Sequence, residues 1–165
     1  MKTAKIYPRL DLSFIDHPFR KLSISTYFCG CPRRCKGCHN PELQNYNNPD
    51  CIEVDYNQFF RQIYMKCKKF EEIEGLVLLG GEPLSYTEFL KRALSKIKIL
   101  KIDIVLYTGY LFEQIDKELL YFIDFVIDGE YREDLKTNTF PASANQRVWQ
   151  KVNNSWIDIT SQFLS

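Results

Sequence analysis

The sequence lacks several features that would mark an exported, membrane-bound or nucleic-acid-binding protein. In 165 residues no apolar run approaches the roughly 20 residues of a membrane span. The first residues, MKTAKIYPRLDLSF, lack the apolar segment of a secretory signal. The net charge is only +1, whereas nucleic-acid binding usually requires strong basicity. There is also no repeat, low-complexity tract or linker. These absences predict a single cytoplasmic domain over residues 1–165, with neither a membrane nor a nucleic acid as partner.

The composition is that of a globular chain with an unusual number of cysteines. Hydrophobic residues make up 45% of the sequence and aromatic residues 15%, which is enough to build a core. In a protein that is not exported, the six cysteines are expected to stay reduced. Their clustered spacing then indicates metal binding rather than disulfides.

Hydrophobic periodicity predicts strands that alternate with helices. The expected strands are 22–28, 75–81, 102–107, 122–127 and, with a weaker pattern, 147–152. The expected helices are 56–69, 87–97 and 111–120. Asp55 and Gln58 are suited to cap the first helix.

Alternating strands and helices form right-handed βαβ units and a mainly parallel sheet. A closed eight-unit barrel typically needs about 250 residues. This α/β chain is shorter, so we expect a single-domain, partial and open βα barrel with one side left without a wall.

Three cysteines follow the first expected strand on one short loop. Cys31, Cys35 and Cys38 stand in the run CPRRCKGC, which we call the cluster loop (residues 31–38). An ordinary iron–sulfur cluster or structural zinc site takes four protein ligands. Three thiolates therefore leave one metal position open, and an open position is what a reacting metal centre keeps.

The other unusual loops also follow strands. They are Gly80–Pro83, Thr108–Tyr110 and Asp128–Tyr131. Ligands of parallel α/β sheets bind at the carboxyl ends of the strands, so these loops are expected to meet the cluster loop. Gly80 and Gly81 allow close approach of the backbone, and Glu82 offers a carboxylate suited to an ammonium group. A turn with a solvated glutamate is the structural alternative.

These motifs resemble those of the radical S-adenosylmethionine (SAM) enzymes, in which such a cysteine run is followed by a GGEP-type strand end. Within them, the segments SISTYFCGC, CHNPEL, DGEY and NQR are most similar to the family of anaerobic ribonucleoside-triphosphate reductase activating proteins. The resemblance extends over residues 15–150, nearly the whole chain. It implies the partial barrel of the radical SAM type.

The resemblance also implies cofactors and their contacts. A 4Fe–4S cluster would sit on Cys31, Cys35 and Cys38, with SAM on the fourth iron. Gly80, Gly81 and Glu82 would hold the methionine ammonium. The backbone at Gly37, Cys38 and His39 would border the adenine, and Asp128 would contact the ribose.

The activity implied is that of an activase for a glycyl-radical enzyme. One electron cleaves SAM to methionine and a 5′-deoxyadenosyl radical, which takes a hydrogen atom from a glycine of the large reductase. An acidic electron donor such as flavodoxin would dock on Arg33, Arg34 and Lys36, unless this is merely a solvated basic loop.

Three alternatives stay open at this point. The partner is another glycyl-radical enzyme such as pyruvate formate-lyase, or the substrate is a small molecule. In the non-enzymatic alternative, Cys29 joins the three loop cysteines in a four-cysteine zinc-binding module. Otherwise Cys29, Cys51 and Cys67 are structural, with Cys67 on the apolar stripe of its helix.

Overall fold

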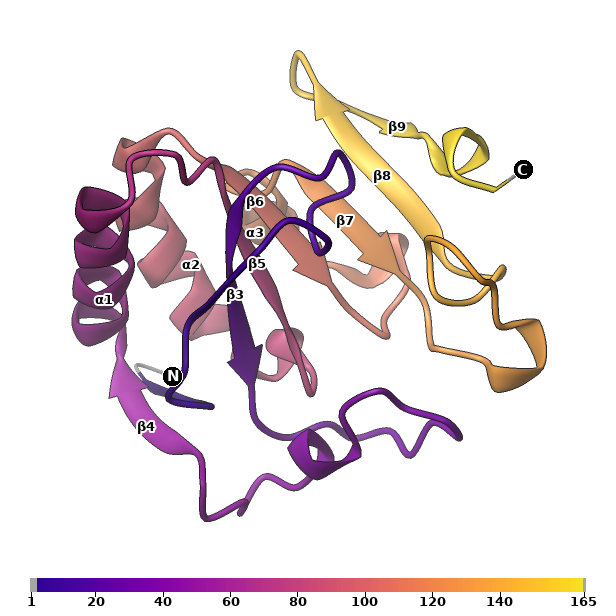
Figure 1. The fold of residues 1–165 in the computed structure, drawn as a ribbon, viewed down its shortest axis with the longest axis horizontal. Helices are drawn as coiled ribbons and strands as arrows, with labels where there is room; N and C mark the ends of the chain where they lie inside the picture. Colours follow the sequence, from indigo (N-terminus) through magenta and orange to yellow (C-terminus); the bar gives the residue numbers. More distant parts are fainter. Residues whose placement is uncertain (1–2, 165) are drawn as a thin grey trace.

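The computed structural model describes residues 3–164. The described residues form a nine-stranded sheet with helices packed on it (Figure 1). The strand order is β4–β1–β3–β5–β6–β7–β8–β9, with β2 paired beside β3. The strands are β1 (Thr3–Ile6), β2 (Asp11–Ser13), β3 (Ser23–Phe28), β4 (Ile52–Asp55), β5 (Gly75–Gly80), β6 (Asp103–Tyr107), β7 (Phe125–Asp128), β8 (Arg147–Val152) and β9 (Ser155–Asp158).

The sheet is parallel at its centre and antiparallel on both sides. Strands β3, β5, β6 and β7 pair in parallel, as the alternating pattern predicts. All other pairings, those of β1, β2, β4, β8 and β9, are antiparallel. The sheet is open, and the described residues form a mixed α/β fold. The sequence did not predict β1, β2, β4 and β9. These strands are only three or four residues long, which is too short for hydrophobic periodicity to reveal them.

Two of the three predicted helices are confirmed with their bounds. They are α1 (Tyr56–Lys69) and α2 (Thr87–Ile97). The Asp55 carboxylate accepts from the Gln58 N–H, and the Gln58 side chain accepts from the Asp55 N–H. This reciprocal cap fixes the start of α1 where the sequence placed it.

The third predicted helix, over residues 111–120, is wrong. The segment contains a 3-10 turn at Phe112–Gln114 and a single α-helical turn, α3 (Lys117–Leu120). Asp116 separates the two, because its backbone is non-helical and its side chain accepts from the N–H groups of Glu118 and Leu119. Such a local cap starts a new helix instead of continuing the old one.

The two faces of the sheet are covered differently. Alternate strand residues, among them Leu76, Leu78 and Leu106, pack beneath the helices in the larger core. The opposite face carries a smaller core: Val77, Val105, Phe125, Ile127, Val148 and Ile159. Partly buried side chains from loops and the chain end, such as Phe140 and Phe163, pack on it. No α-helix of the described residues covers this face.

A disulfide joins Cys29 to Cys51, with their Cα atoms 6.5 Å apart. The expectation that all six cysteines stay reduced is therefore wrong. Strand β1 explains the pairing, because Ile6 lies opposite both Phe28 and Ile52. Cys29 follows Phe28 and Cys51 precedes Ile52, so β1 brings the two cysteines together; their spacing in the sequence does not reveal this.

Among the described residues, no helix is both long and apolar enough to cross a membrane.

Candidate metal-cluster and cofactor site

The loops that were expected to meet do line one cavity, of about 400 Å³. All three cluster-loop cysteines border it, as do Gly80, Gly81 and Glu82 at the end of β5. Residues after β6 and β7 complete this side of the wall: Thr108, Gly109, Gly129, Glu130 and Tyr131. The carboxyl ends of the four parallel strands thus converge on the cysteines, as parallel α/β architecture requires.

Backbone hydrogen bonds join the two segments that flank the cluster loop and tie them to the residues that follow β5. The Gly30 N–H donates to the Leu43 carbonyl at 2.7 Å, and the Glu82 N–H donates to the Gly30 carbonyl at 2.7 Å. A Cβ on Gly81 would lie 2.4 Å from the Gly30 oxygen and 2.5 Å from the Leu43 oxygen. Gly81 is therefore required because three backbone segments meet there.

The three thiols are free and partly buried. Burial raises the pKa of the Cys31 thiol, and the nearby Glu82 carboxylate acts in the same direction. Burial likewise raises the pKa of Cys35, with a further contribution from Glu130 and the neighbouring thiols. Thiolates are the metal-binding form, so these cysteines bind best when a strongly positive centre stabilises their charge.

The donor set consists of three free thiols on one loop, and cysteine thiolates are the ligands of iron–sulfur clusters. Within residues 3–164 no three histidine, cysteine or acidic side chains converge as ligands of one metal ion. The four-cysteine zinc module is not formed, because Cys29 is bonded to Cys51.

Glu82 is a buried carboxylate, only 1% exposed, so it is not the side chain of a solvated turn. Its Oε1 accepts from Arg33 Nη1 at 3.1 Å and from the Gly109 N–H at 2.8 Å. Its Oε2 accepts from the Leu84 N–H at 3.0 Å and from the Thr108 hydroxyl at 2.8 Å. Burial raises the pKa of Glu82, while these hydrogen bonds and the Arg33 charge oppose that shift.

Arg33 is the residue whose position the sequence did not reveal. Its side chain is only 15% exposed. Its Nε donates to Glu130 Oε1 at 2.9 Å, and the guanidinium lies 4.1 Å from the centre of the Tyr110 ring. A run of basic residues usually indicates a solvated loop, which is why this inward orientation was missed.

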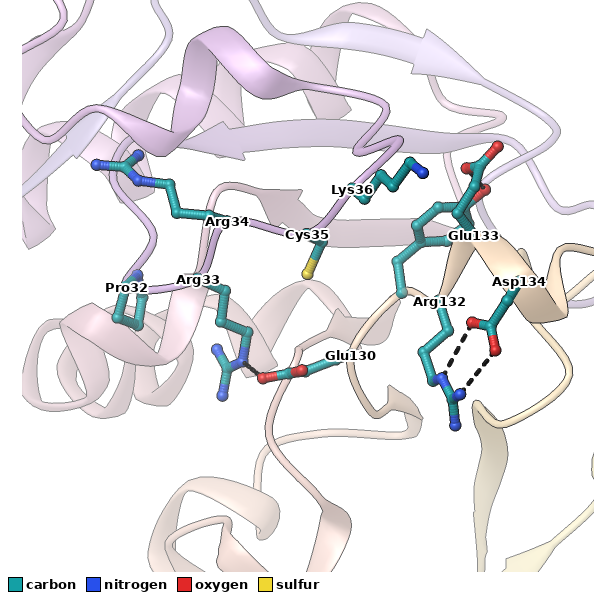
Figure 2. Close-up of a pocket in the computed structure, with 10 residues that line it drawn as sticks. Pro32, Arg33, Arg34, Cys35, Lys36, Glu130, Arg132, Glu133 and Asp134 are labelled. Carbon is teal, nitrogen blue, oxygen red and sulfur yellow. Dashed lines mark hydrogen bonds and ion pairs between the residues drawn. The ribbon is translucent and has the colours of Figure 1, made fainter.

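Figure 2 shows the ion pair of Arg33 and Glu130 among the residues that line a second cavity, of about 630 Å³, next to the first. The cluster loop forms one wall of this cavity and residues 130–134 form the other. Arg34 and Lys36 are exposed on the loop. They remain the basic side chains available to a docking partner.

The remaining predicted site residues fall into two groups. His39 lines the main cavity, with its ring centre 5.3 Å from that of Tyr131. Gly37 does not line it; a Cβ there would collide with the Glu133 carboxylate. Asp128 is fully buried outside the cavity lining, and its carboxylate is held by Arg147.

Further lining residues come from outside the strand-end loops, and of these only Gln146 belongs to a motif that the sequence analysis named, NQR. They are Ile15, Asp16, Thr139, Phe140, Ala142 and Gln146. Asp16 is held in place from two sides, because its carboxylate accepts from Ser25 and its carbonyl accepts from the Tyr107 hydroxyl. These residues lie outside the strand-end loops, so only the folded chain brings them to the cavity.

Comparison with known proteins defines first the class and then the family. Residues 20–149 match the family model described as a 4Fe-4S single cluster domain, so the chain carries an iron–sulfur domain of this class. A relative from Enterobacteria phage T4, named anaerobic ribonucleoside-triphosphate reductase-activating protein, is 31% identical over 94% of this chain and 98% of its own length. A relative of the same name from Haemophilus influenzae is 29% identical over 74% of this chain and 83% of its own length. The chain belongs to this family of activating enzymes.

Proposed function

We propose that this chain binds SAM at a 4Fe–4S cluster and generates a glycyl radical on an anaerobic ribonucleoside-triphosphate reductase. The observation that supports this most directly is the placement of three free thiols and the buried Glu82 carboxylate around one cavity. A three-cysteine set leaves one iron open for SAM. The names of the two relatives support the reductase, rather than pyruvate formate-lyase or a small molecule, as the target.

When bound, the reduced cluster and SAM supply a 5′-deoxyadenosyl radical, formed with methionine by one-electron cleavage of the S–C5′ bond, that abstracts a hydrogen atom from a glycine Cα. The protein's residues position these groups. Cys31, Cys35 and Cys38 hold three irons, and Glu82 receives the methionine ammonium beside the backbone of Gly80 and Gly81.

The adenine would lie along the backbone at Cys38 and His39, beside the rings of His39 and Tyr131, whereas Gly37 lies outside the cavity lining. We assign Asp128 a structural role instead of the ribose contact suggested by the resemblance. Its Oδ1 accepts from the Arg147 N–H and its Oδ2 accepts from the Phe112 N–H, in addition to the ion pair with the Arg147 guanidinium.

The open side gives access to the partner. A glycine loop of the reductase would reach the cavity from the sheet face that loops, and not α-helices, cover, since a large partner needs an open approach. An acidic electron donor such as flavodoxin would dock on Arg34 and Lys36, because Arg33 is engaged by Glu82 and Glu130. We place these reactions in the cytoplasm.

Iron and sulfide analysis after anaerobic reconstitution tests the cluster. We expect about four irons per chain in the parent protein and a large loss when Cys31, Cys35 or Cys38 is replaced by alanine. Cys67→Ala is the matched control, because Cys67 is free but lies on α1. Zinc without iron in the parent protein would contradict the proposal.

Electron paramagnetic resonance tests the activity. Reduced protein, SAM and the reductase are mixed without oxygen, and a glycyl radical signal is expected on the reductase. Omitting SAM should abolish the signal. A cluster-loaded protein that cleaves SAM but never yields a glycyl signal would point to a small-molecule reaction instead.

A further inference from the structure

Glu82 has no free acceptor position in the structure. An ionised carboxylate offers about four lone-pair sites. Four donors fill them: Arg33 Nη1, the Gly109 N–H, the Leu84 N–H and the Thr108 hydroxyl. An ammonium group that binds Glu82 must therefore replace one of these donors.

Arg33 is the donor that can leave without disturbing the backbone. The N–H groups of Leu84 and Gly109 belong to the main chain at the strand ends. The Thr108 hydroxyl also accepts from the Tyr110 N–H at 3.1 Å, which fixes its position. Arg33 instead reaches Glu82 over a long side chain and already donates to Glu130, whose carboxylate is 59% exposed.

We propose that Arg33 is a positioning residue that occupies the ammonium subsite, where its guanidinium competes with the α-amino group of SAM for Glu82. This inference rests on the proposed function. When the amino group binds, Arg33 moves toward Glu130 and the Tyr110 ring, where it keeps a charged acceptor and a π surface. Arg33 lies between Cys31 and Cys35, so the exchange links SAM binding to the position of the cluster loop.

Competition predicts that two variants change SAM affinity in opposite directions. Arg33→Gln removes the competitor and should tighten SAM binding about tenfold, as expected for loss of one charged hydrogen bond. Glu130→Gln removes the negative charge of the second acceptor. Arg33 should then stay more strongly on Glu82, and SAM binding should weaken about threefold. Arg34→Gln, on the same loop but without a contact to Glu82, should leave the affinity unchanged.

The measurement is equilibrium dialysis of labelled SAM against cluster-loaded, unreduced protein without oxygen, so that no turnover occurs. A SAM analogue with hydrogen in place of the α-amino group serves as the second ligand. It keeps the sulfonium charge, so it reports any general change of electrostatic field. Its affinity should be the same in all four proteins, because it does not compete for Glu82.

The outcomes separate this inference from the proposed function. If the parent protein fails to bind SAM, both are overturned. If the parent binds SAM but Arg33→Gln binds it no more tightly than Arg34→Gln, the competition is overturned alone. If Arg33→Gln does not fold, Glu130→Gln decides, because its carboxylate is largely exposed. Unchanged or tighter SAM binding by that variant would then exclude the exchange.

Discussion

The hydroxyl of Tyr86 donates a hydrogen bond to the backbone carbonyl of Cys29. Tyr86 ends the 3-10 turn that follows Glu82, and Cys29 lies two residues before the first cluster cysteine. This buried contact therefore ties the Gly-Gly-Glu-Pro segment to the base of the cluster loop. The Tyr86 hydrogen bond therefore supports both the Gly-Gly-Glu-Pro segment and the cluster loop.

Replacing Tyr86 by phenylalanine should lower the free energy of unfolding by about 1–2 kcal/mol, because the buried Cys29 carbonyl loses its donor. Urea unfolding measures the change. Tyr121→Phe is the control, since Tyr121 is exposed and its hydroxyl makes no hydrogen bond with the described residues. Equal stabilities of the two variants would show that the Tyr86 contact contributes nothing.

Replacing Gly81 by alanine should destabilise the protein by about 1–3 kcal/mol through overpacking. The added Cβ would meet the Gly30 and Leu43 carbonyl oxygens, which are backbone atoms and cannot rotate away. At Gly109 the Cβ would meet only the flexible Arg33 side chain, so Gly109→Ala should cost less. Thermal unfolding compares the two, and an equal loss would contradict the three-segment contact.

The disulfide between Cys29 and Cys51 predicts a labelling pattern. Unfolded but unreduced protein should react with alkylating reagent at the four free cysteines, and reduced protein at all six. Mass spectrometry counts the labels. Six labels without reductant would show that the bond does not form.

The same bond should stabilise the fold. It spans a sequence separation of 22 residues. Loop-closure entropy assigns about 3 kcal/mol to a loop of this size. The double variant Cys29→Ser/Cys51→Ser should lose about this much in urea unfolding, whereas Cys67→Ser should lose little, since Cys67 is unpaired.

Asp103 should make stability depend on pH below pH 4. Burial acts to raise the pKa of Asp103, but the hydrogen bond from His17 and the charge of Lys21 outweigh it, so the pKa is lowered. A lowered folded-state pKa means that the stabilisation is full above the unfolded value of about 3.9 and is lost as pH falls through the folded pKa. In Asp103→Asn this part is absent, so the stability difference from the parent protein should shrink between pH 6 and pH 3. A constant difference in urea unfolding across this range would contradict the assignment.

Local sequence signals predicted much of the fold. The apolar stripes and the Asp55–Gln58 cap gave both long helices with their bounds, because helix periodicity and capping depend on neighbours within one turn. The apolar runs gave the parallel centre of the sheet. The prediction of one helix over residues 111–120 was wrong because the Asp116 side chain competes locally for backbone N–H groups. Hydrophobic periodicity does not report this effect.

The sequence also predicted part of the candidate site. Its chemistry, three thiols on one loop and a carboxylate after two glycines, was determined by the order of residues along the chain. That these loops share one cavity follows from parallel strand order, which the sequence also indicated.

Only the tertiary structure decided which partner each polar side chain takes. In the folded chain Arg33 points inward and pairs with Glu82, and Asp128 pairs with Arg147. Cys29 and Cys51 form a disulfide across β1. Each of these pairs is at least 19 residues apart in the chain. The physical reason is that hydrogen bonds, ion pairs and disulfides depend on distances between atoms of different segments, whereas sequence periodicity reports only which face of its own segment a residue occupies.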